Sequence, residues 1–242
     1  MAYAVFDIET RIDKRLVNET LYRGRELADE AAFDDLRRDL VERRGSDFFP
    51  LSFHIPISIA LGLVGDDRLL QTIESLAAAD YSEEGLVREF WERVEGFENH
   101  CLISFNGRQF DLPVLELQAL RYGCVAKRYF GERGPRHRHA PEQHFDLYDF
   151  ITNYGAYRVR GGFDLLLRGI GLPGKGEIDG SRVQALWEGG RLDVIHAYCR
   201  RDVVQTYFLF LRVELLRGNL SPQRYQELMR ETEHFRRALE QV

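Results

Sequence analysis

Short apolar runs and longer amphipathic segments follow one another along this chain. Residues 3–9, 55–64 and 101–105 are apolar and rich in β-branched and aromatic side chains, and residues 69–73 resemble them. Runs of this length and composition predict β-strands.

The longer segments carry apolar residues every three or four positions, as helices do. They cover residues 82–97, 112–121 and 191–216, and a last helix follows the N-cap residue Ser221 and Pro222. The charged residues 16–44, which end at Gly45, predict a surface helix between the first two strands. Strands come first and helices dominate later, so we expect an α/β fold with helices on both faces of one sheet.

Length and composition are those of a globular protein. The 242 residues are 44% hydrophobic and 30% charged, and we expect a single domain. No apolar run is long enough to span a membrane and no secretory signal pattern is present, so we expect a soluble protein of the cytoplasm. The three cysteines form no Cys-x-x-Cys pair, which argues against a disulfide framework or a zinc site.

The net charge of -6 argues against a protein that coats nucleic acid through its overall field. A local basic surface is still compatible with this charge. Residues 127–138 hold five basic residues and one acid, with Tyr129 and Phe130 among them. Such a segment resembles a lip for single-stranded nucleic acid, although a flexible solvated loop would have the same composition.

Two acids interrupt the first apolar run. Because side chains alternate along a strand, Asp7 and Glu9 project to the same face as Tyr3 and Val5. Like charges about 6 to 7 Å apart on a mostly buried strand repel and lose hydration unless a cation compensates them. A divalent metal is the natural compensator. The alternative is that the strand ends at residue 6 or 7 and that both acids are solvated.

A third acid follows the strand predicted at residues 101–105. Asn106 and Gly107 let the chain turn out of this strand, and Asp111 comes directly before the next predicted helix. Taken alone, Asp111 is best explained as an N-cap. The end of a central strand is also where an α/β sheet places its site, so both interpretations stay open.

A fourth acid lies at the border of the buried face of the helix predicted at 191–216. At about 100° per residue, Asp202 is about 60° from the centre of the apolar stripe, near Cys199. Tyr198 lies one turn before Asp202 on the same side. The pair forms either a hydrogen bond within the helix or part of a site.

In order and separation, these residues resemble the three motifs of the DEDDy 3'-5' exonucleases. This group of the RNase H-like superfamily includes the proofreading domains of family B DNA polymerases. FDIET (6–10), NGRQFDLP (106–113) and YCRRD (198–202) match the three motifs, and residues 144–156 and 169–183 look like a stand-alone family of polymerase-B-like exonucleases. The resemblance implies an RNase H-like mixed sheet in one domain, residues 1–242, with a helical insertion at about 11–50 between strands one and two.

The resemblance also implies a two-metal active site. Asp7, Glu9 and Asp202 would bind one Mg²⁺ or Mn²⁺, and Asp7 would bridge to a second ion held by Asp111 directly or through water. In such a site one ion lowers the pKa of a bound water, and the other, about 3.5 to 4 Å away, stabilises the departing 3' oxygen. Tyr198 would orient or help to deprotonate the attacking water, and a phenol with an ordinary pKa of about 10 suits orientation better.

Three further residues are candidates for substrate contacts. Asn106 fixes the loop that carries Asp111 or touches substrate, and Phe110 packs there or stacks on a base. Lys175, between two glycines, contacts a phosphate or belongs to an ordinary loop. Asp146 and Asp164 each precede a helix-like run, where capping is the better explanation.

The sequence therefore predicts a metal-dependent 3'-5' exonuclease that shortens DNA or RNA from a free, single-stranded 3' end and releases nucleoside 5'-monophosphates. One alternative is a non-catalytic nucleic-acid-binding module of a repair or processing assembly. Another is a structural domain whose acids only cap and pair. Residues 11–50 would form a lid, a substrate wall or only a surface helix. Proofreading is not inherited with the fold, because 242 residues leave no room for a polymerase domain.

Overall fold

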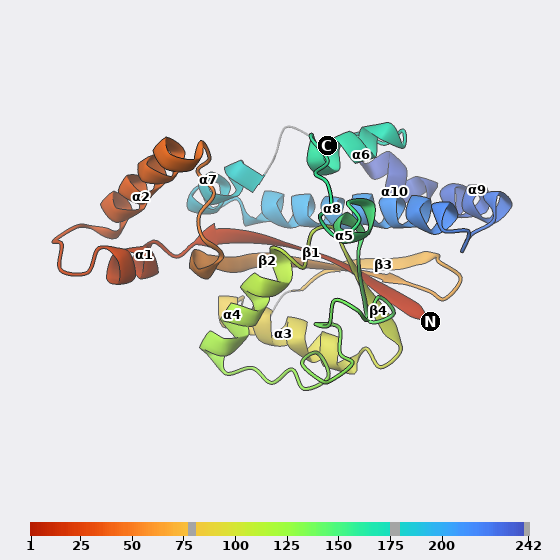
Figure 1. Ribbon diagram of the computed structural model, residues 1–242, viewed down its shortest axis with the longest axis horizontal. Helices are drawn as coiled ribbons and strands as arrows, with labels where there is room; N and C mark the ends of the chain where they lie inside the picture. Colours follow the sequence, from red (N-terminus) through yellow and green to blue (C-terminus); the bar gives the residue numbers. More distant parts are fainter. Residues whose placement is uncertain (77–80, 175–179, 240–242) are drawn as a thin grey trace.

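A five-stranded mixed sheet forms the centre of the computed structural model (Figure 1). The structure describes residues 1–76, 81–174 and 180–239. Across the sheet the order is β3-β2-β1-β4-β5. The pairs β3–β2 and β2–β1 are antiparallel, and the pairs β1–β4 and β4–β5 are parallel. The strands are β1 (Ala2–Ile12), β2 (His54–Val64), β3 (Leu70–Ser75), β4 (His100–Ser104) and β5 (His144–Asp146).

Helices cover both faces of this sheet, as predicted (Figure 1). The long helix α8 crosses one face together with α5, α6, α7, α9 and α10, and α3 and α4 cover the other. The helical elements are α1 (Lys14–Leu21), α2 (Asp29–Arg44), η1 (Leu51–Phe53), α3 (Glu83–Gly96), α4 (Asp111–Tyr122), α5 (Leu147–Ile151), α6 (Gly162–Gly169), η2 (Gly180–Arg182), α7 (Val183–Glu188), α8 (Leu192–Leu216), α9 (Pro222–Glu231) and α10 (Glu233–Ala238). None of the helices in the described residues is long and apolar enough to cross a membrane.

The side chains of β1 are divided between the two helical layers. Tyr3 and Val5 pack in the apolar cluster under α8, and Phe6 and Ile8 pack in the cluster under α3 and α4. β1 continues to Ile12, and its pairing with β2 keeps one register from Tyr3 to Glu9. The alternation therefore brings the acids at positions 7 and 9 to the α8 face. The alternative in which the strand ends at residue 6 or 7 is wrong.

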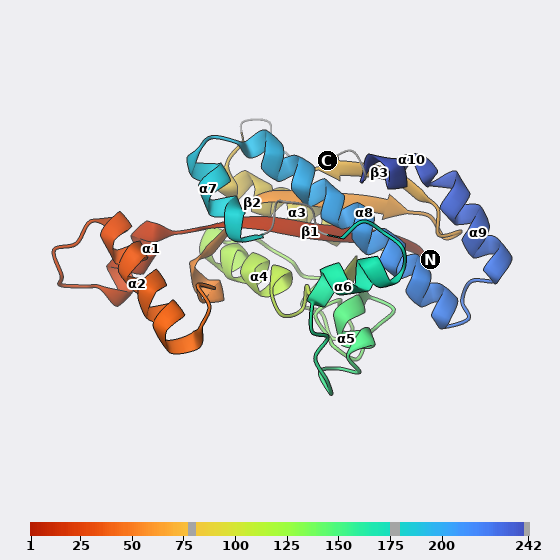
Figure 2. The same ribbon diagram turned by 90° about the horizontal axis from the view of Figure 1, so that it is seen from above.

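The insertion between β1 and β2 contains two helices, α1 and α2, and the prediction of one surface helix is wrong. The loop between α1 and α2 includes Gly24, whose φ of 82° is readily adopted only by glycine. α2 ends at Gly45, as predicted. The two helices share an apolar cluster of their own, in which the rings of Phe33 and Phe49 stack with centroids 4.8 Å apart. In Figure 2 this helix pair projects beyond one end of the sheet.

Candidate active site

The candidate site lies where β1 and β4 separate. In the described part of the chain, β4 pairs with β1 only from Ala2 to Val5. The chain then turns out of β4 at Asn106, which has a φ of 64°, and enters α4. The opening contains a cavity of about 540 Å³ that is lined by all four acids of the sequence motifs. Openings at strand ends are where α/β sheets bind ligands.

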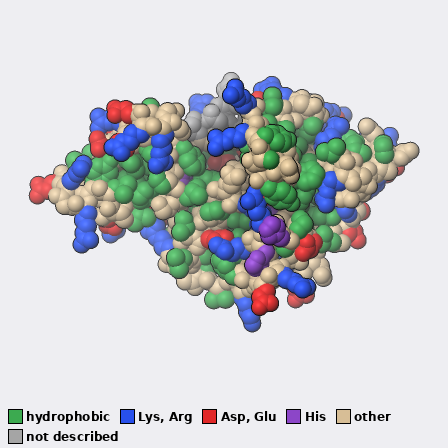
Figure 3. Space-filling view, in the orientation of Figure 1, with side chains coloured by type: hydrophobic (Ala, Val, Ile, Leu, Met, Phe, Trp, Pro, Cys, Tyr) green, Lys and Arg blue, Asp and Glu red, His purple; other side chains and the backbone are tan. Residues whose placement is uncertain are grey.

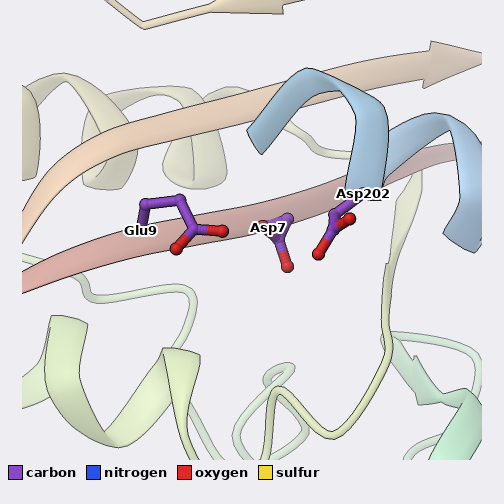
Figure 4. Close-up of side chains that lie close together, drawn as sticks. All are labelled: Asp7, Glu9 and Asp202. Atoms are coloured by element: carbon purple, nitrogen blue, oxygen red, sulfur yellow. The ribbon is translucent and has the colours of Figure 1, made fainter. Parts of the chain in front are cut away.

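Three of the acids come together in this cavity. Asp7 and Glu9 extend from β1 and Asp202 from α8, and one ligand oxygen of each lies within 4.8 Å of the others (Figure 4). Glu9 is 8% exposed and Asp202 is 4% exposed, so water screens their mutual repulsion poorly. A set of carboxylate oxygens suits hard divalent cations such as Mg²⁺ and Mn²⁺. The donor set therefore fits the metal that the motifs imply.

Asp111 reaches the cavity from α4, and its position differs from the N-cap interpretation. Phe110 occupies the N-cap position without a side-chain cap hydrogen bond, and Asp111 is the first residue of the helix. Its Oδ1 accepts a hydrogen bond from the backbone N–H of Ile8, at 3.3 Å, on the stretch of β1 that β4 does not pair. The N-cap interpretation is therefore wrong. Asp111 instead contacts the backbone between the two acids of β1.

Tyr198 forms part of the cavity wall, one turn before Asp202 on α8. Burial raises the pKa of its phenol, and the charges of Asp202, Glu9 and Asp7 and a hydrogen bond with Asp202 act in the same direction. The hydrogen bond between Tyr198 and Asp202, which the sequence predicted as one alternative, is therefore present, and both residues line the cavity. A phenol whose proton is donated to a carboxylate still has an oxygen that can accept a hydrogen bond from a water.

The loop between β4 and α4 is held by one carboxylate of β5. Asp146 accepts the backbone N–H groups of Asn106 and Arg108, both at 2.9 Å. It also caps α5, as predicted. The loop that leads to Asp111 is therefore fixed to the neighbouring strand.

The other candidates of the sequence have different outcomes. Asn106 and Phe110 line the cavity, whereas Lys175 lies outside the described residues. Asp164 is not an N-cap, because Gly161 holds that position in α6 and Asp164 pairs with Arg168 at 2.9 Å. Its capping prediction is wrong.

Residues 46–241 match the family described as a predicted 3'-5' exonuclease related to the exonuclease domain of PolB. The chain belongs to this family. The matched residues include Asp111, Tyr198 and Asp202, whereas Asp7 and Glu9 precede them. No curated protein sequence matches the chain.

The solved structures that are similar to this member of the family include a polymerase and an exonuclease. One is the family B DNA polymerase from the hyperthermophilic archaeon Pyrobaculum calidifontis, with a TM-score of 0.54 and 16% identity over 89% of this chain and 24% of the polymerase. The other is exonuclease I in its apo form, with a TM-score of 0.34 and 12% identity over 91% of this chain and 47% of exonuclease I. The likeness to the polymerase supports the RNase H-like fold. The chain spans about a quarter of that polymerase and about half of exonuclease I.

A second hollow, of about 460 Å³, adjoins the cavity of this exonuclease-family protein. Arg108, Arg136 and Arg138 line it, and Gln109 lines both hollows. The basic segment 127–138 is anchored, because Arg108 donates to the carbonyl of Arg136 at 3.2 Å and Arg128 donates to the carbonyl of Val94 at 3.0 Å. Figure 3 shows Lys and Arg side chains spread over this face among acidic ones. On this face, the basic groups beside the cavity are local and interspersed with acids.

Cys199 and Phe48 are among the residues at the site that the sequence did not single out as functional. The Sγ–H of Cys199 donates to the backbone oxygen of Asp7 at 3.3 Å, although Cys199 was expected only as buried apolar packing. Phe48, from the insertion, lines the cavity with the acids. In the sequence, Phe48 is marked only as one of two adjacent aromatic residues, Phe48 and Phe49, in a polar segment. No periodicity in that segment predicts which of the two rings is exposed.

Proposed function

We propose that this protein is a metal-dependent 3'-5' exonuclease that hydrolyses phosphodiester bonds from the 3' end of DNA or RNA and releases nucleoside 5'-monophosphates. The observation that carries the proposal is the cluster of Asp7, Glu9 and Asp202, with ligand oxygens within 4.8 Å of one another. Membership of an exonuclease family supports the reaction class. The shared cavity supports assigning Asp111 and Tyr198 to the same site.

In this proposal the acids hold the cofactor and the other residues position the substrate. Asp7, Glu9 and Asp202 hold one cation, and Asp111 holds a second beside Asp7. When bound, Mg²⁺ or Mn²⁺, two per site, supplies an activated water and offsets charge on the departing 3' oxygen. The phenol of Tyr198 donates its proton in the hydrogen bond to Asp202, and the phenol oxygen orients the attacking water by accepting a hydrogen bond from it. Asn106 and Phe110 contact the terminal nucleotide.

The proposed substrate is a free, single-stranded 3' end. Arg136 and Arg138 are about half exposed at the hollow beside the cavity, where they pair with Glu116 and Asp149 and can meet a phosphate backbone. A net charge of -6 makes such local contacts more important than the overall field. A cytoplasmic location and a part in DNA repair are proposed from the sequence alone.

A nuclease panel tests the proposal. The protein is incubated with matched 5'-labelled DNA and RNA, single- and double-stranded, in Mg²⁺, Mn²⁺ or EDTA. We expect shortening from the 3' end only with metal, and nucleoside 5'-monophosphates as products. Asp7→Ala and Asp202→Ala should abolish the reaction, whereas Asp66→Ala, at an exposed acid in the turn between β2 and β3, should leave it unchanged.

Two outcomes would count against an exonuclease. The absence of turnover on every oligonucleotide with either metal would refute the proposal. Nucleic-acid binding without turnover, unaffected by a chelator, would instead support the non-catalytic binding module.

A further inference from the structure

An exposed aromatic side chain of the insertion borders the acidic cavity. Phe48 lies between α2 and η1 and is 55% exposed, yet it lines the cavity that contains Asp7 and Glu9. Its ring centroid is 5.7 Å from that of Phe110 and 5.3 Å from that of His54. The cavity thus has acids on one side and an aromatic wall on another.

The insertion's own core turns this ring outward. The next residue, Phe49, is 4% exposed and stacks on Phe33 inside the cluster that α1 and α2 share. Phe49 belongs to this cluster, whereas Phe48 lies outside it, beside His54 and Phe110. The exposure of Phe48 follows from how the insertion packs.

Hydrogen bonds hold this segment at a fixed place relative to the acids. His54 Nε2 lies 3.2 Å from the carbonyl oxygen of Phe49, and His54 Nδ1 lies 2.8 Å from the hydroxyl of Thr10, the residue after Glu9. A carbonyl only accepts, so Nε2 carries the proton and Nδ1 accepts from Thr10. Burial lowers the pKa of His54, which favours this neutral form. The ring at position 48 is therefore connected to β1 through one imidazole.

We propose that Phe48 stacks on the base of the 3'-terminal nucleotide, next to Phe110, while that nucleotide's phosphate lies at the acids. This inference rests on the proposed exonuclease and specifies how the enzyme recognises its substrate. Every base has a π-face, so an aromatic wall selects an unpaired terminal nucleotide without regard to sequence. A cavity of about 540 Å³ has the size of a site for one small ligand. The insertion then acts as a substrate wall.

Two single-stranded oligonucleotides that differ only at the 3' terminus separate base stacking from phosphodiester chemistry. One ends in a normal nucleotide and the other in an abasic tetrahydrofuran sugar. The wild-type protein should hydrolyse the base-bearing end with a kcat/KM about 10-fold higher or more. Phe48→Ala should lose most of this preference and still hydrolyse the abasic end.

Three further variants distinguish stacking from general apolar contact. Phe48→Trp should keep the preference for the base, and Phe48→Leu, which retains apolar volume without a π-face, should lose it. Leu21→Ala changes another exposed apolar residue of the insertion and should behave as wild type.

A binding measurement in EDTA gives a readout that does not need turnover. An oligonucleotide with 2-aminopurine at its 3' terminus should lose fluorescence on binding the wild-type protein, because the base stacks on the ring. Phe48→Ala should bind the same oligonucleotide with little change in fluorescence.

The outcomes separate this inference from the proposed function. If the wild type is active and Phe48→Ala keeps the full base preference, the inference is overturned and the exonuclease stands. If the wild type degrades neither oligonucleotide, both fail. If Phe48→Ala converts a dimer to a monomer in sedimentation, Phe48 belongs to an interface between copies of this chain, and the inference is overturned as well.

Discussion

At the scale of single residues, the carboxylates of the site lie closer together than their own charges favour. Oxygens of Asp7, Glu9 and Asp202 are within 4.8 Å of one another, and Glu9 and Asp202 are largely withdrawn from water. Repulsion at this distance in a partly buried site costs stability unless a cation is present. The apolar packing of β1 against α8 holds these carboxylates together against that repulsion.

Asp202→Asn should therefore raise the melting temperature in EDTA and abolish stabilisation by Mn²⁺. The amide removes one of three like charges, and each kcal/mol gained raises the melting temperature by about 2 to 4 °C in a chain of this size. Mn²⁺ at 100 times its Kd should stabilise the wild type by about 2.7 kcal/mol and the variant much less. Calorimetry with and without Mn²⁺ measures both effects, with Asp66→Asn as the control. A wild-type melting temperature that Mn²⁺ does not change would contradict a metal site at these acids.

At the scale of elements, Asp146 connects β5, α5 and the loop that carries Asp111. It ends β5, caps α5 and accepts the backbone N–H groups of Asn106 and Arg108. Burial raises the pKa of its carboxyl, and hydrogen bonds from backbone N–H groups partly offset that effect. Several backbone donors would lose their acceptor if this side chain were removed.

Asp146→Ala should lower the free energy of unfolding by about 2 to 4 kcal/mol, since it removes a cap and leaves buried donors without an acceptor. It should also reduce exonuclease activity, because the loop that positions Asp111 is released. Ser221→Ala, which removes only the cap of α9, should cost about 1 kcal/mol and leave activity unchanged. Urea unfolding and the nuclease assay measure the two effects. If both variants lose stability and both keep full activity, Asp146 does not support the site.

At the scale of the whole molecule, the insertion has an apolar core separate from the clusters on the two faces of the sheet. Polar contacts join it to the rest, such as the ion pair of Asp13 with Arg121 at 2.8 Å and the hydrogen bond from Ile12 N–H to Gln184 at 2.7 Å. Clusters with few apolar contacts between them can unfold independently. The wall that bears Phe48 therefore depends on the insertion's own stability.

Phe33→Ala should destabilise the insertion by about 3 to 5 kcal/mol while the sheet stays folded. Hydrogen exchange should then speed up in residues 14–53 and stay slow in β2 and α8. The base preference of the exonuclease should fall as in Phe48→Ala, because Phe49 loses its stacking partner. Val41→Ala, at an exposed position of α2, serves as the control. Faster exchange throughout the chain would show that the insertion is not a separate unit.

The sequence by itself determined what depends on local periodicity and local caps. The period of two along β1 placed Asp7 and Glu9 on one face, and the helical period placed Asp202 one turn from Tyr198 at the edge of a buried face. The caps at Ser221 and Asp146 are local in the same sense, because a cap is completed within the next turn. These local predictions agree with the structure because the tertiary contacts form on the same strand and helix faces.

The tertiary structure alone decided what depends on residues distant in sequence. Asp111 is not a cap, because the short pairing of β4 with β1 leaves the N–H of Ile8 for its carboxylate. Phe48 faces the cavity because Phe49 is buried against Phe33. Neither contact has a signature in the neighbouring residues, since long-range packing fixes both. The sequence thus predicted the acids of the site, and only the fold showed what surrounds them.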